Sequence, residues 1–90
     1  STIYLGSRGG VVSVHTDIPF GVVNCATLAL NGIPAQSAFP DDRGDLVVKV
    51  GLDRVKAIIA PPSATLTLTG ETKDGVPFAG SDTVPVIAAT

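Results

Sequence analysis

Residues 41–50 read Asp41-Asp42-Arg43-Gly44-Asp45-Leu46-Val47-Val48-Lys49-Val50, a polar turn that leads directly into an apolar strand. Side chains alternate along a strand, so Leu46, Val48 and Val50 share one face and Val47 and Lys49 share the other. Because both faces are mostly apolar, we predict that residues 46–50 form a central strand. The rest of the chain is expected to supply shorter strands that cover it.

The composition describes one small domain that is poor in charge. Ninety residues fit a single domain, which we expect to span residues 1–90. Apolar residues make up 44% of the chain and charged residues 16%, whereas the usual charged share is about 25%. Part of the apolar content is therefore expected to face a neighbouring domain or a partner. The alternative is that Ala, Val, Thr and Gly dilute the charge without forming a patch.

Charge and hydropathy exclude two classes of partner. The net charge is −2, and the six basic residues are spread along the chain with only one Tyr and three Phe. Nucleic-acid binding requires a basic patch with stacking residues, so it is not expected. No apolar run approaches the ~18–20 residues that span a bilayer, so no membrane span is expected either.

Short β-prone runs separated by turn signals predict an all-β fold. Asn31-Gly32 and Asp74-Gly75 are favoured hairpin pairs, and Ala79-Gly80-Ser81 is expected to turn again. Residues 22–25 are expected to form a bridge or a tight connection. The expected strands cover residues 2–5, 11–16, 26–30, 33–39, 46–50, 63–71, 76–78 and 82–87. This spacing predicts a single immunoglobulin-like antiparallel β-sandwich of about seven short strands.

Residues 52–59 are the only helical candidate. Leu52, Val55 and Ile59 are spaced like the apolar stripe of a helix. Pro61-Pro62 ends the segment. We expect two turns at most, and a loop is the alternative.

The turn before the central strand is a candidate metal site. Calcium takes six to eight oxygen ligands in proteins, and Asp41, Asp42 and Asp45 could supply three. The alternative is a polar turn in which an Asp side chain accepts hydrogen bonds from its own backbone and Gly44 supplies the unusual φ.

No residue pattern predicts catalysis. His15 is the sole histidine, and Ser13 stands roughly 6.5–7 Å from it along the strand, too far for a nucleophile–base pair. Cys25 is the sole cysteine and is expected to be a buried, unreactive thiol. The sequence therefore predicts a protein that is not an enzyme.

Three segments resemble a family of secreted prokaryotic β-sandwich modules. Residues 3–12, Ile-Tyr-Leu-Gly-Ser-Arg-Gly-Gly-Val-Val, are similar to its Ser-Arg-Gly-Val opening. Residues 27–35, Thr-Leu-Ala-Leu-Asn-Gly-Ile-Pro-Ala, are similar to its middle. Residues 66–84 resemble its closing hairpin, Leu-Thr-Gly-x-Thr-x-Asp-Gly followed by Gly-Ser-Asp.

The resemblance implies an extracellular or cell-surface setting and no shared catalytic activity. Many members carry a longer Asp-x-Asn-Gly-Asp-Gly-x-x-Asp turn that looks like a calcium loop. Here the turn is shorter, and Arg43 adds a positive charge to it.

The favoured hypothesis is a structural or assembly module of an extracellular or cell-surface protein. Both terminal segments are apolar and uncharged, so they could pair with a neighbour's sheet and build filaments. The residues expected to mediate this self-association are Thr2, Ile3, Tyr4, Leu5, Val84, Val86 and Ile87. The alternative is an accessory module that binds calcium or a glycan; a small hydrolase is a third hypothesis.

Overall fold

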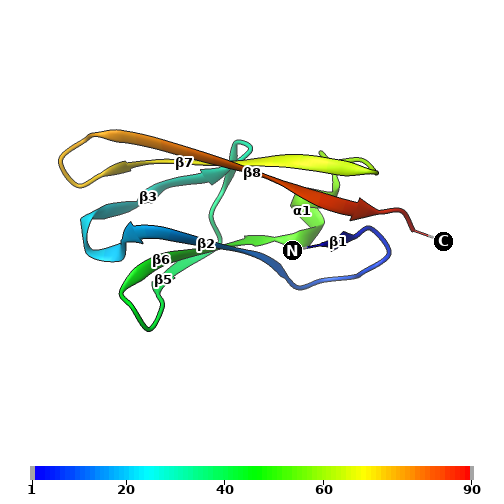
Figure 1. The fold of residues 1–90 in the computed structure, drawn as a ribbon, viewed down its shortest axis with the longest axis horizontal. Helices are drawn as coiled ribbons and strands as arrows, with labels where there is room; N and C mark the ends of the chain where they lie inside the picture. The colour runs from blue at the N-terminus through cyan, green and yellow to red at the C-terminus, as the bar shows by residue number, and fades with distance from the viewer. Residues whose placement is uncertain (1, 90) are drawn as a thin grey trace.

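The chain folds as a β-sandwich of two sheets, which confirms the predicted all-β class (Figure 1). The computed structural model describes residues 2–89. The strands are β1 (Ile3–Tyr4), β2 (Val11–Pro19), β3 (Val23–Leu30), β4 (Ile33–Pro34), β5 (Ser37–Pro40), β6 (Asp45–Gly51), β7 (Ser63–Thr72) and β8 (Pro77–Ile87). One sheet has five strands in the order β1-β8-β7-β3-β4, and the other has three in the order β2-β6-β5. Neighbouring strands are antiparallel except β1 and β8, which run parallel.

Strand β6 is the centre of the three-stranded sheet, as its sequence predicts. Leu46, Val48 and Val50 are fully buried on the face that meets the other sheet. Val47 points the opposite way and is still 1% exposed, because the register places His15 and Phe39 on either side of it. The ammonium of Lys49 lies 5.2 Å from the centre of the Phe39 ring. Its charge is attracted to the face of the ring, and its alkyl stem shields part of this outer face from water.

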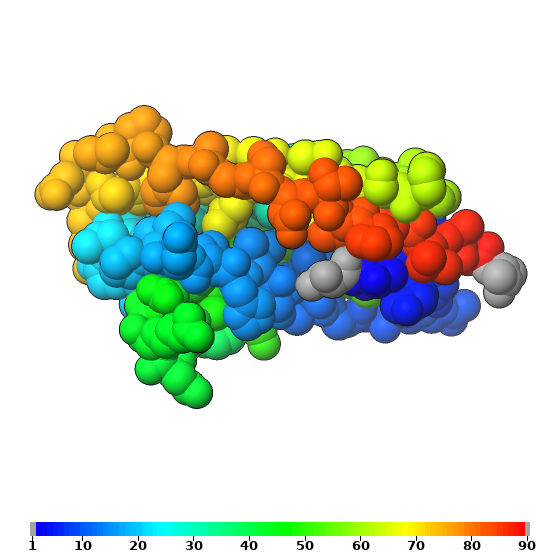
Figure 2. All heavy atoms as spheres, in the orientation of Figure 1, coloured from blue at the N-terminus to red at the C-terminus, as the bar shows by residue number. Residues whose placement is uncertain are grey.

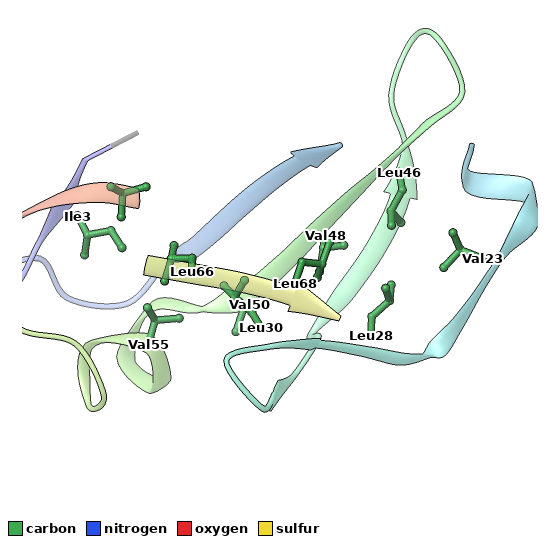
Figure 3. Packing of buried hydrophobic residues seen from close by; sticks show 11 residues of the cluster. Ile3, Val23, Leu28, Leu30, Leu46, Val48, Val50, Val55, Leu66 and Leu68 are labelled. Carbon is green, nitrogen blue, oxygen red and sulfur yellow. The ribbon is translucent and has the colours of Figure 1, made fainter. Parts of the chain in front are cut away.

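The core lies between the two sheets (Figure 3). Leu66 and Leu68 of β7 alternate with outward threonines, so they meet the valines of β6 across the gap. Leu28 and Leu30 of β3 are 3% and 1% exposed. These predicted inward positions are all correct.

The helical segment is shorter than its pattern allows. Helix α1 covers Leu52–Lys56 and buries Val55 against the core. Ile59 packs against the same core from the segment that follows. A 3-10 helix, η1 (Phe20–Val22), joins β2 to β3.

The segment of residues 33–39 is not one strand. Asn31 and Gly32 have φ values of 49° and 83° and form the predicted hairpin, but only Ile33–Pro34 pair with β3. Proline lacks the N–H that would extend the ladder. The chain then crosses to the other sheet, where Ser37–Pro40 pair with β6.

Two other local predictions were wrong. Residues 22–25 were expected to be a bridge or connection, whereas Val23 begins the eight-residue strand β3. Ala79-Gly80-Ser81 was expected to turn, whereas β8 runs without interruption and pairs with β7 from Pro77 to Pro85. A long partner strand thus extends a local sequence that favours a turn.

The molecule is elongated, with extents of 45 × 24 × 18 Å. Within residues 2–89, no helix is long and apolar enough to cross a bilayer.

Candidate functional site: an apolar groove between two sheet edges

The sandwich is open along one side, where β8 and β2 are neighbouring edges of the two sheets. Strand β1 pairs with β8 only at Val86 and Ile87. Residues 77–83 of β8 therefore have β7 on one side and no strand on the other among the described residues. In Figure 2, β8 (orange) and β2 (blue) run along this face, and yellow atoms of β7 are visible between them.

The backbone of β8 presents unpaired groups at this edge. Val86 donates its N–H to the carbonyl of Pro62 at 2.9 Å, so the even-numbered residues of β8 direct their backbone groups toward β7. The odd-numbered residues direct theirs the other way, where Leu5 donates to the carbonyl of Ile87 at 2.9 Å. Ala79, Ser81 and Thr83 therefore point their backbone groups at the free edge.

Between the two edges lies a groove of about 630 Å³. Both sheets line it with apolar side chains, of which the main ones are Val12, Val14, Ile18, Leu30, Leu66, Leu68, Phe78 and Val84. Ile3 of β1 also lines the groove. Gly80 pairs with Leu68 and so faces the groove, and a Cβ atom built on it would meet nothing within 4 Å. The groove is therefore apolar and has free space at the middle of the edge.

The charged groups that line this groove are acidic. Asp17 and Asp82 line it together with His15, and no Lys or Arg does so among the described residues. Asp82 pairs with Leu66, which places it on the core-facing side of β8. One carboxylate oxygen of Asp82 accepts the N–H of Thr83 at 2.9 Å. An inward-facing charge on an edge strand is a usual guard against unselective pairing.

The residues predicted to mediate self-association gather at the other end of the same edge. Ile3, Val84 and Val86 are buried, whereas Tyr4 and Ile87 are 56% and 47% exposed. The register pairs Ile3 with Val86 and Tyr4 with Ile87. Leu5 is half-buried and Thr2 is exposed. The two terminal segments thus pair with each other inside one chain.

The acidic turn is organised by its own backbone. One carboxylate oxygen of Asp41 accepts the N–H of Arg43 at 2.8 Å and that of Asp45 at 3.0 Å. Gly44 has a φ of 83° and donates to the carbonyl of Asp41 at 3.0 Å. The hydrogen bonds from Asp45 and Arg43 lower the pKa of the Asp41 carboxyl.

This geometry does not gather a set of metal ligands. Within residues 2–89, no three acidic, His or Cys side chains lie close enough together to hold an ion. Asp41, Asp42 and Asp45 share a turn but do not form such a group. Calcium binding at this turn stays a prediction.

His15 and Cys25 are both exposed. For Cys25 this corrects the prediction of a buried thiol. The register of β3 against β7 shifts between Asn24 and Ala29, and Thr27 spans the bulge by accepting the N–H of Glu71 at 2.8 Å. The bulge turns Cys25 away from the core.

The groove itself was not predicted from the sequence. Phe78, Gly80, Asp82, Val84 and Val86 alternate with period two, which is the signal that could have revealed a continuous strand. Gly80 and Ser81 are residues that favour turns, and this local signal outweighs the alternation when the sequence is considered alone.

Comparison of the chain with protein-family models, with curated proteins and with solved structures finds no match.

Proposed function

We propose that this chain is a non-enzymatic structural module of an extracellular or cell-surface protein, and that it self-associates by strand pairing. The β1–β8 contact is the observation that carries the proposal. Strand β1 is two residues long, lies at a sheet edge and buries Ile3 to 5% exposure. The resemblance of the opening and closing segments to secreted β-sandwich modules supports the extracellular setting.

The connection after β1 favours exchange between copies. Residues 6–10 contain three glycines, and Gly9 and Gly10 have φ values of 65° and 80°. A loop of this kind can release a short strand without unfolding the rest of the sheet. Strand β1 of one copy would then pair with β8 of the next. Such a head-to-tail contact does not close on itself, so it would extend into filaments.

The mass of the assembled species tests this proposal. We expect the intact chain to assemble as its concentration rises, and a chain lacking residues 1–5 to stay monomeric. Light scattering after size exclusion measures the mass, and far-UV circular dichroism confirms that both chains are folded.

A second variant covers the case in which the loss of Ile3 unfolds the domain. Deleting Gly9 and Gly10 shortens the loop, hinders β1 from folding back and is expected to increase assembly. If the intact chain and both variants have the same mass at equal concentration, strand exchange is wrong.

A further inference from the structure

We propose that residues 77–83 of β8 and the adjoining groove receive a β-strand from a partner protein. The added strand would run parallel to β8, place apolar side chains in the groove and present a lysine or arginine to Asp82. This site lies beside the β1 contact and does not depend on exchange of β1, so either proposal can fail alone.

The free edge of β8 supplies the main-chain part of this recognition. Ala79 and Ser81 offer both N–H and C=O groups to a neighbour, and Thr83 offers its carbonyl. A peptide that adds to a sheet edge gains affinity from such backbone pairing and specificity from alternate side chains.

Strand β1 sets the direction of the added strand. It already occupies the far end of this edge in parallel with Val86 and Ile87. Its Ile3 side chain is buried in the core cluster and also lines the groove. An added strand beside residues 77–83 would extend the line of β1 along β8. Every second side chain of that strand would then point into the groove, as Ile3 does. The open space at Gly80 leaves room for one of them.

The acidic lining selects the chemistry of the occupant. Asp82 faces the groove at the free edge, and Asp17 lines it from β2. An acidic strand would bring like charges together, whereas a basic residue would pair with Asp82. The carboxylate would then turn from the Thr83 N–H toward the added cation.

The acidic lining of the groove also favours a partner protein over a second copy of this chain. The strands that lie at sheet edges are β1, β2, β4 and β5, together with the free part of β8. None of them contains a lysine or arginine. Among the described strands, only the central β6 carries one, at Lys49.

The probe is an end-blocked synthetic peptide of about eight residues, the length of a strand that spans residues 77–84 at about 3.3 Å per residue. Its sequence alternates valine and threonine. A set of such peptides is made, and each member carries one lysine at a different position. Matched peptides carry glutamate in place of lysine, and a third version has N-methylated amides that cannot pair with a strand. Isothermal titration with the full chain measures affinity.

We expect the best lysine peptide to bind up to about fivefold more tightly than its glutamate counterpart, the upper end of the range for a partly exposed charge pair. Asp82→Asn should remove most of that difference. The N-methylated peptide should bind at least tenfold more weakly. Amide hydrogen exchange at Ala79 and Ser81 should slow on binding.

Gly80→Leu fills the groove and should reduce binding at least tenfold, while the fold has space to accept it. Thr69→Leu adds the same side chain at an exposed position of the neighbouring strand β7, outside the groove, and should leave binding unchanged. The chain lacking residues 1–5 should still bind the peptide even if it no longer assembles.

Four results would overturn the proposal: no binding by any peptide, equal binding of the lysine and glutamate sets, full binding of the N-methylated version, or full binding by Gly80→Leu. Cross-linking of β8 to β8 between copies, without peptide binding, would instead assign this edge to a second copy.

Discussion

Gly70 and Gly80 both face the core from paired strands, but only Gly70 is tightly enclosed. A Cβ atom on Gly70 would lie 2.7 Å from Cζ of Phe78 and 2.9 Å from Cδ2 of Leu28. Leu28 is buried and cannot move freely, so we expect Gly70→Ala to lower the free energy of unfolding by about 1–3 kcal/mol. Urea denaturation followed by circular dichroism measures the change.

Gly80→Ala is the matched control for this effect. Nothing lies within 4 Å of its added Cβ, and alanine restricts the unfolded chain more than glycine does. Its stability should therefore be unchanged or up to about 1 kcal/mol higher. Equal losses for the two variants would mean that Gly70 is not enclosed as described.

Asp41 should make stability depend on acidity. Its pKa is lowered from 3.8 by hydrogen bonds from the backbone of Asp45 and Arg43, so the folded chain holds its proton less tightly than the unfolded chain. The stability that the carboxylate contributes is present above pH 3.8 and is lost as the pH falls through the lowered pKa. Urea midpoints of the intact chain should fall over this range.

Asp41→Asn keeps an acceptor oxygen but cannot ionise, so its urea midpoint should fall less steeply in acid. Asp42→Asn removes a carboxylate from the same turn and should keep the acid dependence that Asp41 supplies. Parallel pH profiles for the intact chain and Asp41→Asn would contradict the role given to this carboxylate.

Strand β6 should be the element least tolerant of charge. Val48 is fully buried at its centre, and Val48→Asp would bury an unpaired carboxylate at a cost of several kcal/mol. We expect the variant to lose most of its folded signal in thermal melts. Val76→Asp makes the same change at a side chain that is 58% exposed and should cost less than about 0.5 kcal/mol. Comparable losses would show that β6 is not the central strand.

The local sequence pattern is sufficient to predict the core where the alternation of apolar residues along a strand matches the burial of its side chains. The spacing of two residues predicts that Leu46, Val48 and Val50 share one buried face, and the same spacing predicts it for Leu66 and Leu68. The Asn31-Gly32 turn was also correct, since its left-handed geometry is encoded by those two residues.

The features that the local pattern does not predict depend on pairing between segments that are distant in the sequence. Ala79-Gly80-Ser81 is turn-like in isolation, yet pairing with residues 67–69 of β7 holds it extended. The bulge that exposes Cys25 depends on a threonine hydroxyl meeting Glu71, which local sequence does not reveal. The groove arises from two edges that lie far apart in the chain; His15 and Asp82, which both line it, are 67 positions apart. Spacing within a segment carries no information about such neighbours.

The molecule as a whole carries little charge for its surface. Its net charge is −2, its isoelectric point is about 4.9, and its exposed large apolar side chains are spread over several elements, among them Tyr4, Val22, Phe39, Ile58 and Val76. Proteins associate most readily where net charge vanishes. We therefore expect solubility to be lowest near pH 4.9 and to rise on either side. Turbidity across a pH series measures this.

The chain lacking residues 1–5 distinguishes the effect of net charge on turbidity from the effect of strand exchange. If low net charge is the cause, its turbidity should peak at a similar pH, because the deleted residues carry no charged side chain. A flat turbidity profile for the intact chain would show that apolar contacts or strand pairing, rather than net charge, control its association.

The parallel arrangement of β1 and β8 has a mechanical consequence. Tension applied in opposite directions through Ile3 and Ile87 would draw the two strands past each other lengthwise, so their hydrogen bonds would be loaded together in shear. Only two residue pairs resist this movement, whereas β7 and β8 are paired over nine positions. Strand β1 would therefore detach first under load, and its detachment would lengthen the free edge of β8 while the rest of the sandwich stayed folded.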